Sequence, residues 1–126
     1  MANKLTVKSV EFFKSVSQVN GQPIFSGKYT ELHFEKYPVT TEMPAIAINC
    51  HAAGKFDALY SIRARLGDQI IFESAPSLIH GRDAGGGGDI GFIGNIKAIT
   101  FPGTGLYMFD IIFDGQVIHS EPLILN

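Results

Sequence analysis

The densest group of chemically distinctive residues is the glycine-rich segment HGRDAGGGGDIG, residues 80–91. Its spacing Gly86-x-Gly88-x-x-Gly91 formally matches the fingerprint of dinucleotide-binding loops. That fingerprint holds pyrophosphate only where a helix begins directly after it. The following residues, FIGNIKAITF, alternate in polarity and are rich in β-branched side chains, which predicts a strand instead. We therefore expect residues 80–91 to be an exposed, mobile connection between two strands, and we expect no cofactor there.

Three charged residues give this segment a second interpretation. Arg82, Asp83 and Asp89 flank the four consecutive glycines and could contact another protein. Ordering such a segment costs backbone entropy, so a partner chain would have to supply the contacts that order it. The segment is therefore a candidate partner-binding loop.

Histidine and cysteine show no spacing typical of a catalytic or metal site. His33, His51, His80 and His119 are scattered and form no HxH or HExxH pair. Cys50 precedes His51 directly, but neighbours in a strand point to opposite faces and cannot act as a catalytic pair. We expect no catalytic residues, no metal ligands and no enzymatic activity. A metal-dependent enzyme assembled from distant strands is kept as the third interpretation.

Other side chains have a structural or binding interpretation. Asp110 lies inside the apolar run LYMFDIIF, so its carboxyl group, if buried, must be hydrogen-bonded or protonated. We expect it to have a structural partner. Tyr29, Phe34 and Tyr37 cluster in KYTELHFEKY and could form a stacking platform for a sugar or another small ligand. The absence of tryptophan from the chain makes sugar binding the weaker interpretation.

The elements that must position these residues are strands. DALYSIRARL, residues 57–66, alternates between apolar and polar positions, as a half-buried strand does. LYMFDIIF, residues 106–113, is apolar on much of both faces, which indicates a central strand. Gly67-Asp68 and Asp114-Gly115 separate strand-like runs and predict tight hairpins. These patterns predict one all-β domain over residues 1–126, an antiparallel sandwich of about eight strands.

Composition restricts the function classes. The formal net charge is −2, so no basic surplus is available to neutralise nucleic-acid phosphates. No apolar run is long enough for a membrane helix, and the start has no signal-peptide pattern. The single cysteine excludes an internal disulfide. We expect neither nucleic-acid nor membrane binding, and a cytoplasmic location.

Two stretches carry a resemblance to known proteins. FPGTGLYMFDIIFDGQVIHSEPLILN resembles the end of many immunoglobulin-like sandwiches, in which a Gly-x-Tyr opens a late strand and the tyrosine hydroxyl bonds to nearby backbone. Tyr107 holds the matching position. Together with NGQPIFSGKYTELHFEKYPVTTEMPAIAINCHA, it resembles a family of small uncharacterised bacterial immunoglobulin-like proteins. The resemblance implies a fold and supplies no catalytic residues, and the glycine segment departs from it.

These observations leave the biological function unknown and favour a non-enzymatic interaction or structural module. We expect a homo-oligomer, or binding to another protein in a bacterial or phage-derived assembly. The alternative is a sandwich that binds a small ligand or glycan. The terminal strands EPLILN and KLTV carry few charges that would guard an edge, so we expect one of them to pair with another chain or to be covered.

Overall fold

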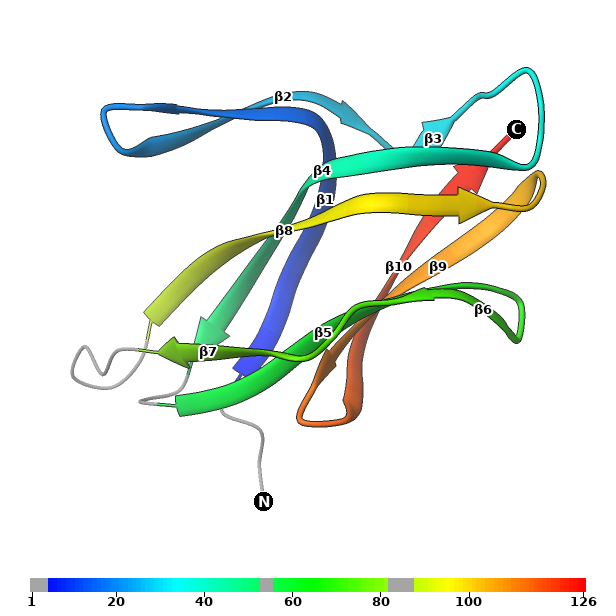
Figure 1. Cartoon of the computed structure of the whole chain (residues 1–126). Helices are drawn as coiled ribbons and strands as arrows, with labels where there is room; N and C mark the ends of the chain where they lie inside the picture. Colours follow the sequence, from blue (N-terminus) through cyan, green and yellow to red (C-terminus); the bar gives the residue numbers. More distant parts are fainter. Residues whose placement is uncertain (1–4, 53–55, 82–87) are drawn as a thin grey trace.

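The computed structural model describes residues 5–52, 56–81 and 88–126, and its regular structure there is entirely β-strand. Two sheets pack face to face around one core, which confirms the predicted all-β sandwich (Figure 1). The strands are β1 (Leu5–Val19), β2 (Gln22–Tyr29), β3 (Glu31–Leu32), β4 (Val39–Ala52), β5 (Phe56–Leu66), β6 (Gln69–Glu73), β7 (Ser77–Gly81), β8 (Gly88–Phe101), β9 (Gly105–Phe113) and β10 (Gln116–Leu125).

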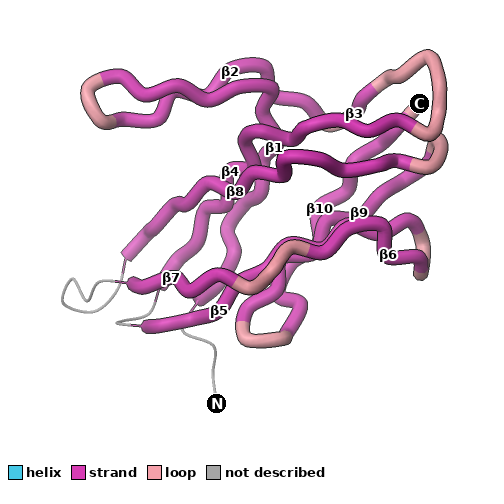
Figure 2. Tube along the Cα trace, in the orientation of Figure 1, coloured by secondary structure: helices cyan, strands magenta, loops and turns pink. Residues whose placement is uncertain are grey.

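One sheet has four strands in the order β2-β1-β4-β8, and the other has six (Figure 2). The six-stranded sheet has the order β3-β10-β9-β5-β6, with β7 also paired to β5. Every pairing is antiparallel except the short parallel pairing of β3 with β10. The described residues form ten strands instead of about eight, partly because two short strands share one edge of β5. They are separated at Pro76, which has no backbone N–H to donate.

The two strands expected from alternation lie side by side in the six-stranded sheet. β5 and β9 pair in register from Tyr60↔Phe113 to Leu66↔Tyr107. β9 lies between β5 and β10, and its residues from Phe109 to Phe113 are all buried. The sequence of this strand is apolar on both faces because it occupies the interior of a sheet as well as the interior of the sandwich.

Tight turns join neighbouring strands where the sequence has Asn-Gly or Asp-Gly. Asp114 and Gly115 have φ of 50° and 82°, which places both central residues of the β9–β10 turn in the left-handed region. Asn20 and Gly21 have φ of 52° and 77° in the turn between β1 and β2. Such turns match the twist of the strands that they join, so these two dipeptides set the register of their hairpins.

Both ends of the glycine-rich segment belong to strands. Gly81 ends β7 and β8 begins at Gly88, so the prediction of a loop over residues 80–91 is wrong at both ends. Asp89 pairs with His51 of β4, and Gly91 pairs with Asn49. Backbone hydrogen bonds along β4 outweigh the weak strand preference of glycine at these positions. Arg82 and Asp83 lie outside the described residues.

Tyr107 connects the start of β9 to the preceding turn. Its side chain is fully buried, and its ring packs edge-on against Phe101 with the centroids 5.1 Å apart. Its hydroxyl group donates a hydrogen bond of 2.7 Å to the carbonyl oxygen of Gly103. The ring therefore fills the core while the hydroxyl group stabilises the turn between β8 and β9.

Replacing Tyr107 with phenylalanine is expected to lower the free energy of unfolding by about 1 kcal/mol, because it removes one buried hydrogen bond and keeps the ring. Urea unfolding of both proteins measures the difference. Tyr60→Phe is the matched control, since the half-buried Tyr60 ring packs on Phe92 and its hydroxyl group has no hydrogen bond within the described residues. Equal urea midpoints for the Tyr107 variant and the wild type would refute this role.

Candidate binding face

Exposed apolar side chains gather on one face of the molecule. Nine large apolar side chains are exposed in the described part of the chain, and six of them belong to the six-stranded sheet. The six are Leu59, Ile70, Leu78, Leu106, Val117 and Ile124. Residues that alternate with core positions point away from the core, so these six lie on the outer face of this sheet. This outer face is therefore the candidate interaction surface of the described residues.

The register of the strands brings these residues together in pairs. Leu59 of β5 lies opposite Leu78 of β7, and Leu106 of β9 lies opposite Ile124 of β10. Side chains of directly opposed residues in antiparallel strands contact one another. The two pairs lie at different heights along the strands, so apolar surface flanks the middle of the face on both sides.

A buried carboxylate lies in the middle of this face. Asp110 is opposite Arg63 of β5 and Ser120 of β10, and its side chain is 1% exposed. Arg63 donates a hydrogen bond from Nε to the Oδ2 atom of Asp110 at 3.0 Å, and its Nη2 atom lies 2.9 Å from the same oxygen. Arg65 donates from Nε to the same oxygen at 2.9 Å, and Ser120 donates to Oδ1 at 2.6 Å. The strand therefore buries a charge whose two oxygens are both hydrogen-bonded.

These contacts determine the charge state of Asp110. Burial by itself raises the pKa of the carboxyl group, but hydrogen bonds from Arg65, Ser120 and Arg63 outweigh burial and hold this pKa below its usual value. The same contacts raise the pKa of Arg65, chiefly through its hydrogen bond to Asp110. The cluster of Arg63, Arg65, Asp110 and Ser120 is thus ionised and structural. Asp110 could be singled out in the sequence, whereas its partners required the alignment of β5, β9 and β10.

The aromatic platform expected from Tyr29, Phe34 and Tyr37 is divided between two places. The Tyr29 ring stacks on Phe12 with the centroids 5.9 Å apart, and burial raises the pKa of its hydroxyl group to about 12. Phe34 meets Tyr37 edge-on at 6.1 Å, and the Tyr37 hydroxyl group donates to the carbonyl oxygen of Asn126 at 3.1 Å. All three rings are partly buried against the core, so each is occupied by internal packing.

The remaining candidate residues lie elsewhere on the four-stranded sheet. Asp89 binds Lys8 at 2.9 Å and His51 at 3.1 Å, all three being exposed. Lys8 and His51 lower the pKa of Asp89 through hydrogen bonds. Cys50 is fully buried and burial raises the pKa of its thiol to about 11, while its neighbour His51 faces solvent. Within residues 5–52, 56–81 and 88–126, no three acidic, histidine or cysteine side chains are grouped to hold a metal ion.

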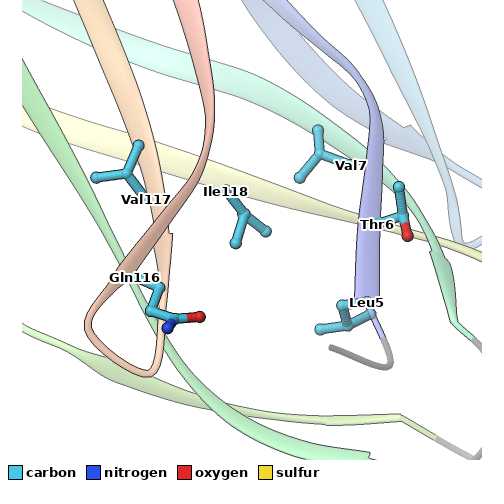
Figure 3. Close-up of a pocket in the computed structure, with 6 residues that line it drawn as sticks. All are labelled: Leu5, Thr6, Val7, Gln116, Val117 and Ile118. Atoms are coloured by element: carbon cyan, nitrogen blue, oxygen red, sulfur yellow. The ribbon is translucent and has the colours of Figure 1, made fainter. Parts of the chain in front are cut away.

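The side of the sandwich between β1 and β10 is open. A hollow of about 600 Å³ lies there, with Leu5, Thr6 and Val7 on one side and Gln116, Val117 and Ile118 on the other (Figure 3). Each strand carries a bulge beside the hollow, at Lys8 in β1 and at Ile118 in β10.

The edge of β10 has further protection. β3 covers its end at Ile124 and Leu125, and Pro122 removes one backbone donor. His119 and Glu121 lie opposite the core residues Ile111 and Phe109, and they bond to each other at 2.9 Å. Bulges, proline and the inward-facing carboxylate of Glu121 all disfavour pairing with another strand, so the sheet face is the better candidate for contact with a partner.

Replacing Asp110 with asparagine is expected to lower the free energy of unfolding near neutral pH by about 2 kcal/mol, the scale of hydrogen bonds to a charged group. A carboxylate whose pKa is lowered by folding stabilises the protein above its unfolded-state pKa of about 3.9, and this stabilisation is lost as the pH falls through the folded-state pKa. The difference between the variant and the wild type at neutral pH should therefore shrink in strong acid, as the pH falls through the lowered pKa of Asp110. Urea unfolding at neutral pH and in strong acid measures this change. Glu42→Gln, which removes an exposed carboxylate of β4, should have little effect at either pH.

Comparison with known proteins places the chain in a family. No curated protein matches it. No helix within the described residues is long and apolar enough to cross a membrane. A family model described as a family of unknown function, DUF6941, matches residues 14–126. The match begins within β1 and includes every later strand of both sheets. The chain therefore belongs to DUF6941.

Proposed function

We propose that this protein is a non-enzymatic, immunoglobulin-like interaction module that self-associates through the outer face of its six-stranded sheet. The strand order supports the immunoglobulin-like part of the proposal. If β1, β4 and β8 are strands A, B and E, and β10, β9 and β5 are strands G, F and C, these six strands have the neighbour order of that fold. The Tyr107 hydroxyl group at the start of β9 bonds to Gly103, as in a tyrosine corner.

The observation that carries the interaction role is the concentration of exposed apolar side chains on one face. Six of the nine in the described residues lie there, around a cluster whose central carboxylate is neutralised within the chain. Covering a charge is costly unless it is already paired and hydrogen-bonded. Because Asp110 is bonded to two arginines and a serine, a partner can cover this face without leaving a carboxylate unpaired, while the surplus guanidinium charge needs to keep its contact with water.

A second copy of the chain is the partner that fits this face best. Apolar surface lies on both sides of the central cluster, so a two-fold axis in the plane of the interface brings apolar side chains against apolar side chains. Two such sheets would pack about 10 Å apart with their strands inclined by about 30°. Arg63 and Arg65 keep 26% and 31% of their side chains exposed, which leaves their remaining N–H groups free to contact water trapped at the interface.

The size of the face indicates a modest affinity. Four strand positions at a spacing of about 4.8 Å, with nine residues of β9 at about 3.4 Å each, cover roughly 19 Å by 30 Å. The footprint of about 600 Å² per partner is below the approximately 800 Å² of a standard interface. We therefore expect a dimer that dissociates on dilution in the micromolar range. We also expect a reducing compartment such as the cytoplasm, where the single Cys50 remains a thiol.

Leu106→Lys is expected to abolish self-association, because it places a charge in the apolar part of the face. Size-exclusion chromatography with light scattering over a dilution series measures the mass against the 13.7 kDa of one chain. Val19→Lys is the matched control, since Val19 is 52% exposed and Leu106 is 54% exposed but Val19 lies in β1 of the other sheet. A wild-type protein that stays monomeric at about 100 µM, or a Leu106 variant that dimerises like the wild type, would contradict the proposal.

A further inference from the structure

The β1–β2 hairpin forms a groove on the opposite side of the molecule. β1 pairs with β4 only up to Phe13, and beyond that point it pairs with β2 alone, so the hairpin extends past the sheet (Figure 1). A groove of about 450 Å³ lies between this hairpin and the outer face of β4 and β8. We call it the hairpin groove. It shares no residue with the outer face of the six-stranded sheet.

The floor of the hairpin groove consists of two rows of residues, with the small residues Ala47 and Gly91 in neighbouring rows. Glu11, Ala47 and Ile93 form one row across β1, β4 and β8, and Asn49 and Gly91 form the next row. Ala47 lies between the core residues Ile46 and Ile48 and so points away from the core. Three strands at about 4.8 Å and two rows about 7 Å apart give a floor of roughly 10 Å by 7 Å, the size of a bicyclic ring.

Aromatic side chains form the wall. The rings of Phe13 and Phe25 lie with their centroids 4.8 Å apart and are tilted by 30°, and Pro23 lies beside them in β2. A ring bound on the floor would contact these rings on one side and Ile93 on the other. Ile93 is 38% exposed, so part of this apolar surface meets solvent in the unliganded chain.

Two hydrogen-bond acceptors border the groove, the amide oxygen of Asn49 and the carboxylate of Glu11. The Asn49 amide nitrogen donates to the Ser9 hydroxyl group at 3.0 Å, which fixes the amide with its oxygen directed toward Gly91. That oxygen lies 3.1 Å from the position that a Cβ atom at Gly91 would occupy, so it borders the open floor. The Glu11 carboxylate uses one oxygen to bind Lys28 at 2.9 Å, and its other oxygen can accept a hydrogen bond.

We propose that the hairpin groove binds an aromatic amine, with its ring on the floor at Ala47 and Gly91 and its N–H groups donated to Asn49 and Glu11. An apolar body matches the aromatic wall, and N–H donors match the two acceptors. An aromatic acid replaces the ammonium donors with a carboxylate, which can only accept hydrogen bonds and therefore cannot donate to the free oxygen of Glu11. Binding needs only one copy of the chain, so the site is independent of self-association through the other sheet.

Tryptamine is a suitable probe, because the chain contains no tryptophan and indole fluorescence reports on the ligand alone. Titrating tryptamine with the full chain should give saturable binding to one site per chain. 3-Indolepropionate replaces the ammonium group with a carboxylate. Its affinity should be lower than that of tryptamine by about fivefold, the scale of one exposed charge contact. Equal or tighter binding of 3-indolepropionate would overturn the assignment of an amine, and the absence of saturable tryptamine binding would overturn the site.

Two variants locate the binding. Gly91→Val and Ala47→Phe each fill the floor and should weaken tryptamine binding by about tenfold or more, as steric conflict in a fitted pocket does. Leu106→Lys, which alters the opposite sheet, should bind tryptamine as the wild type does. Urea midpoints establish which variants are folded, and either filling variant that remains folded is sufficient for the test. Unchanged affinity in a folded filling variant would refute the location.

Discussion

The alternation of side chains along β9 forces Asp110 onto the face of its sheet that points away from the core, where Arg63, Arg65 and Ser120 bond its carboxylate. A slip of one residue would carry Asp110 into the core and expose Ile111. The same register places Tyr107 against Phe101 and sets Leu106 opposite Ile124. The buried charge and its partners thus stabilise one alignment of β5, β9 and β10, on which both the core and the outer face depend.

Much of the fold could be predicted from local patterns. The strands around residues 57–66 and 106–113 follow from alternation, and the turn at Asp114-Gly115 follows from the positive φ that both positions require. These features depend on neighbours in the sequence. Local pattern does not predict the start of β8 at Gly88 and Gly91, because this part of the strand forms through pairing with β4, some forty positions away.

The candidate sites were harder to predict, because they combine residues from strands that are distant in sequence. Arg63 alternates normally within β5, and only the pairing of β5 with β9 brings it to Asp110. The hairpin groove needs the position of Phe13 and Phe25 relative to β4 and β8. The rings of the expected platform lie apart for the opposite reason. Tyr29 and Tyr37 are close in sequence, but one ring packs on Phe12 and the other on Phe34.

The parallel pairing of β3 with β10 has a consequence for the time at which the sandwich can close. β3 at Glu31–Leu32 is made early, yet its partner β10 begins only at Gln116. β4 likewise waits for β8, since Thr40 bonds Thr100 sixty positions later. Closing such long loops precedes the contacts that compensate for it, so folding is slow compared with that of helical proteins. During synthesis β1 can pair with β2 and β4 early, whereas β3 lacks β10, and β4 lacks β8, until those strands have left the ribosome.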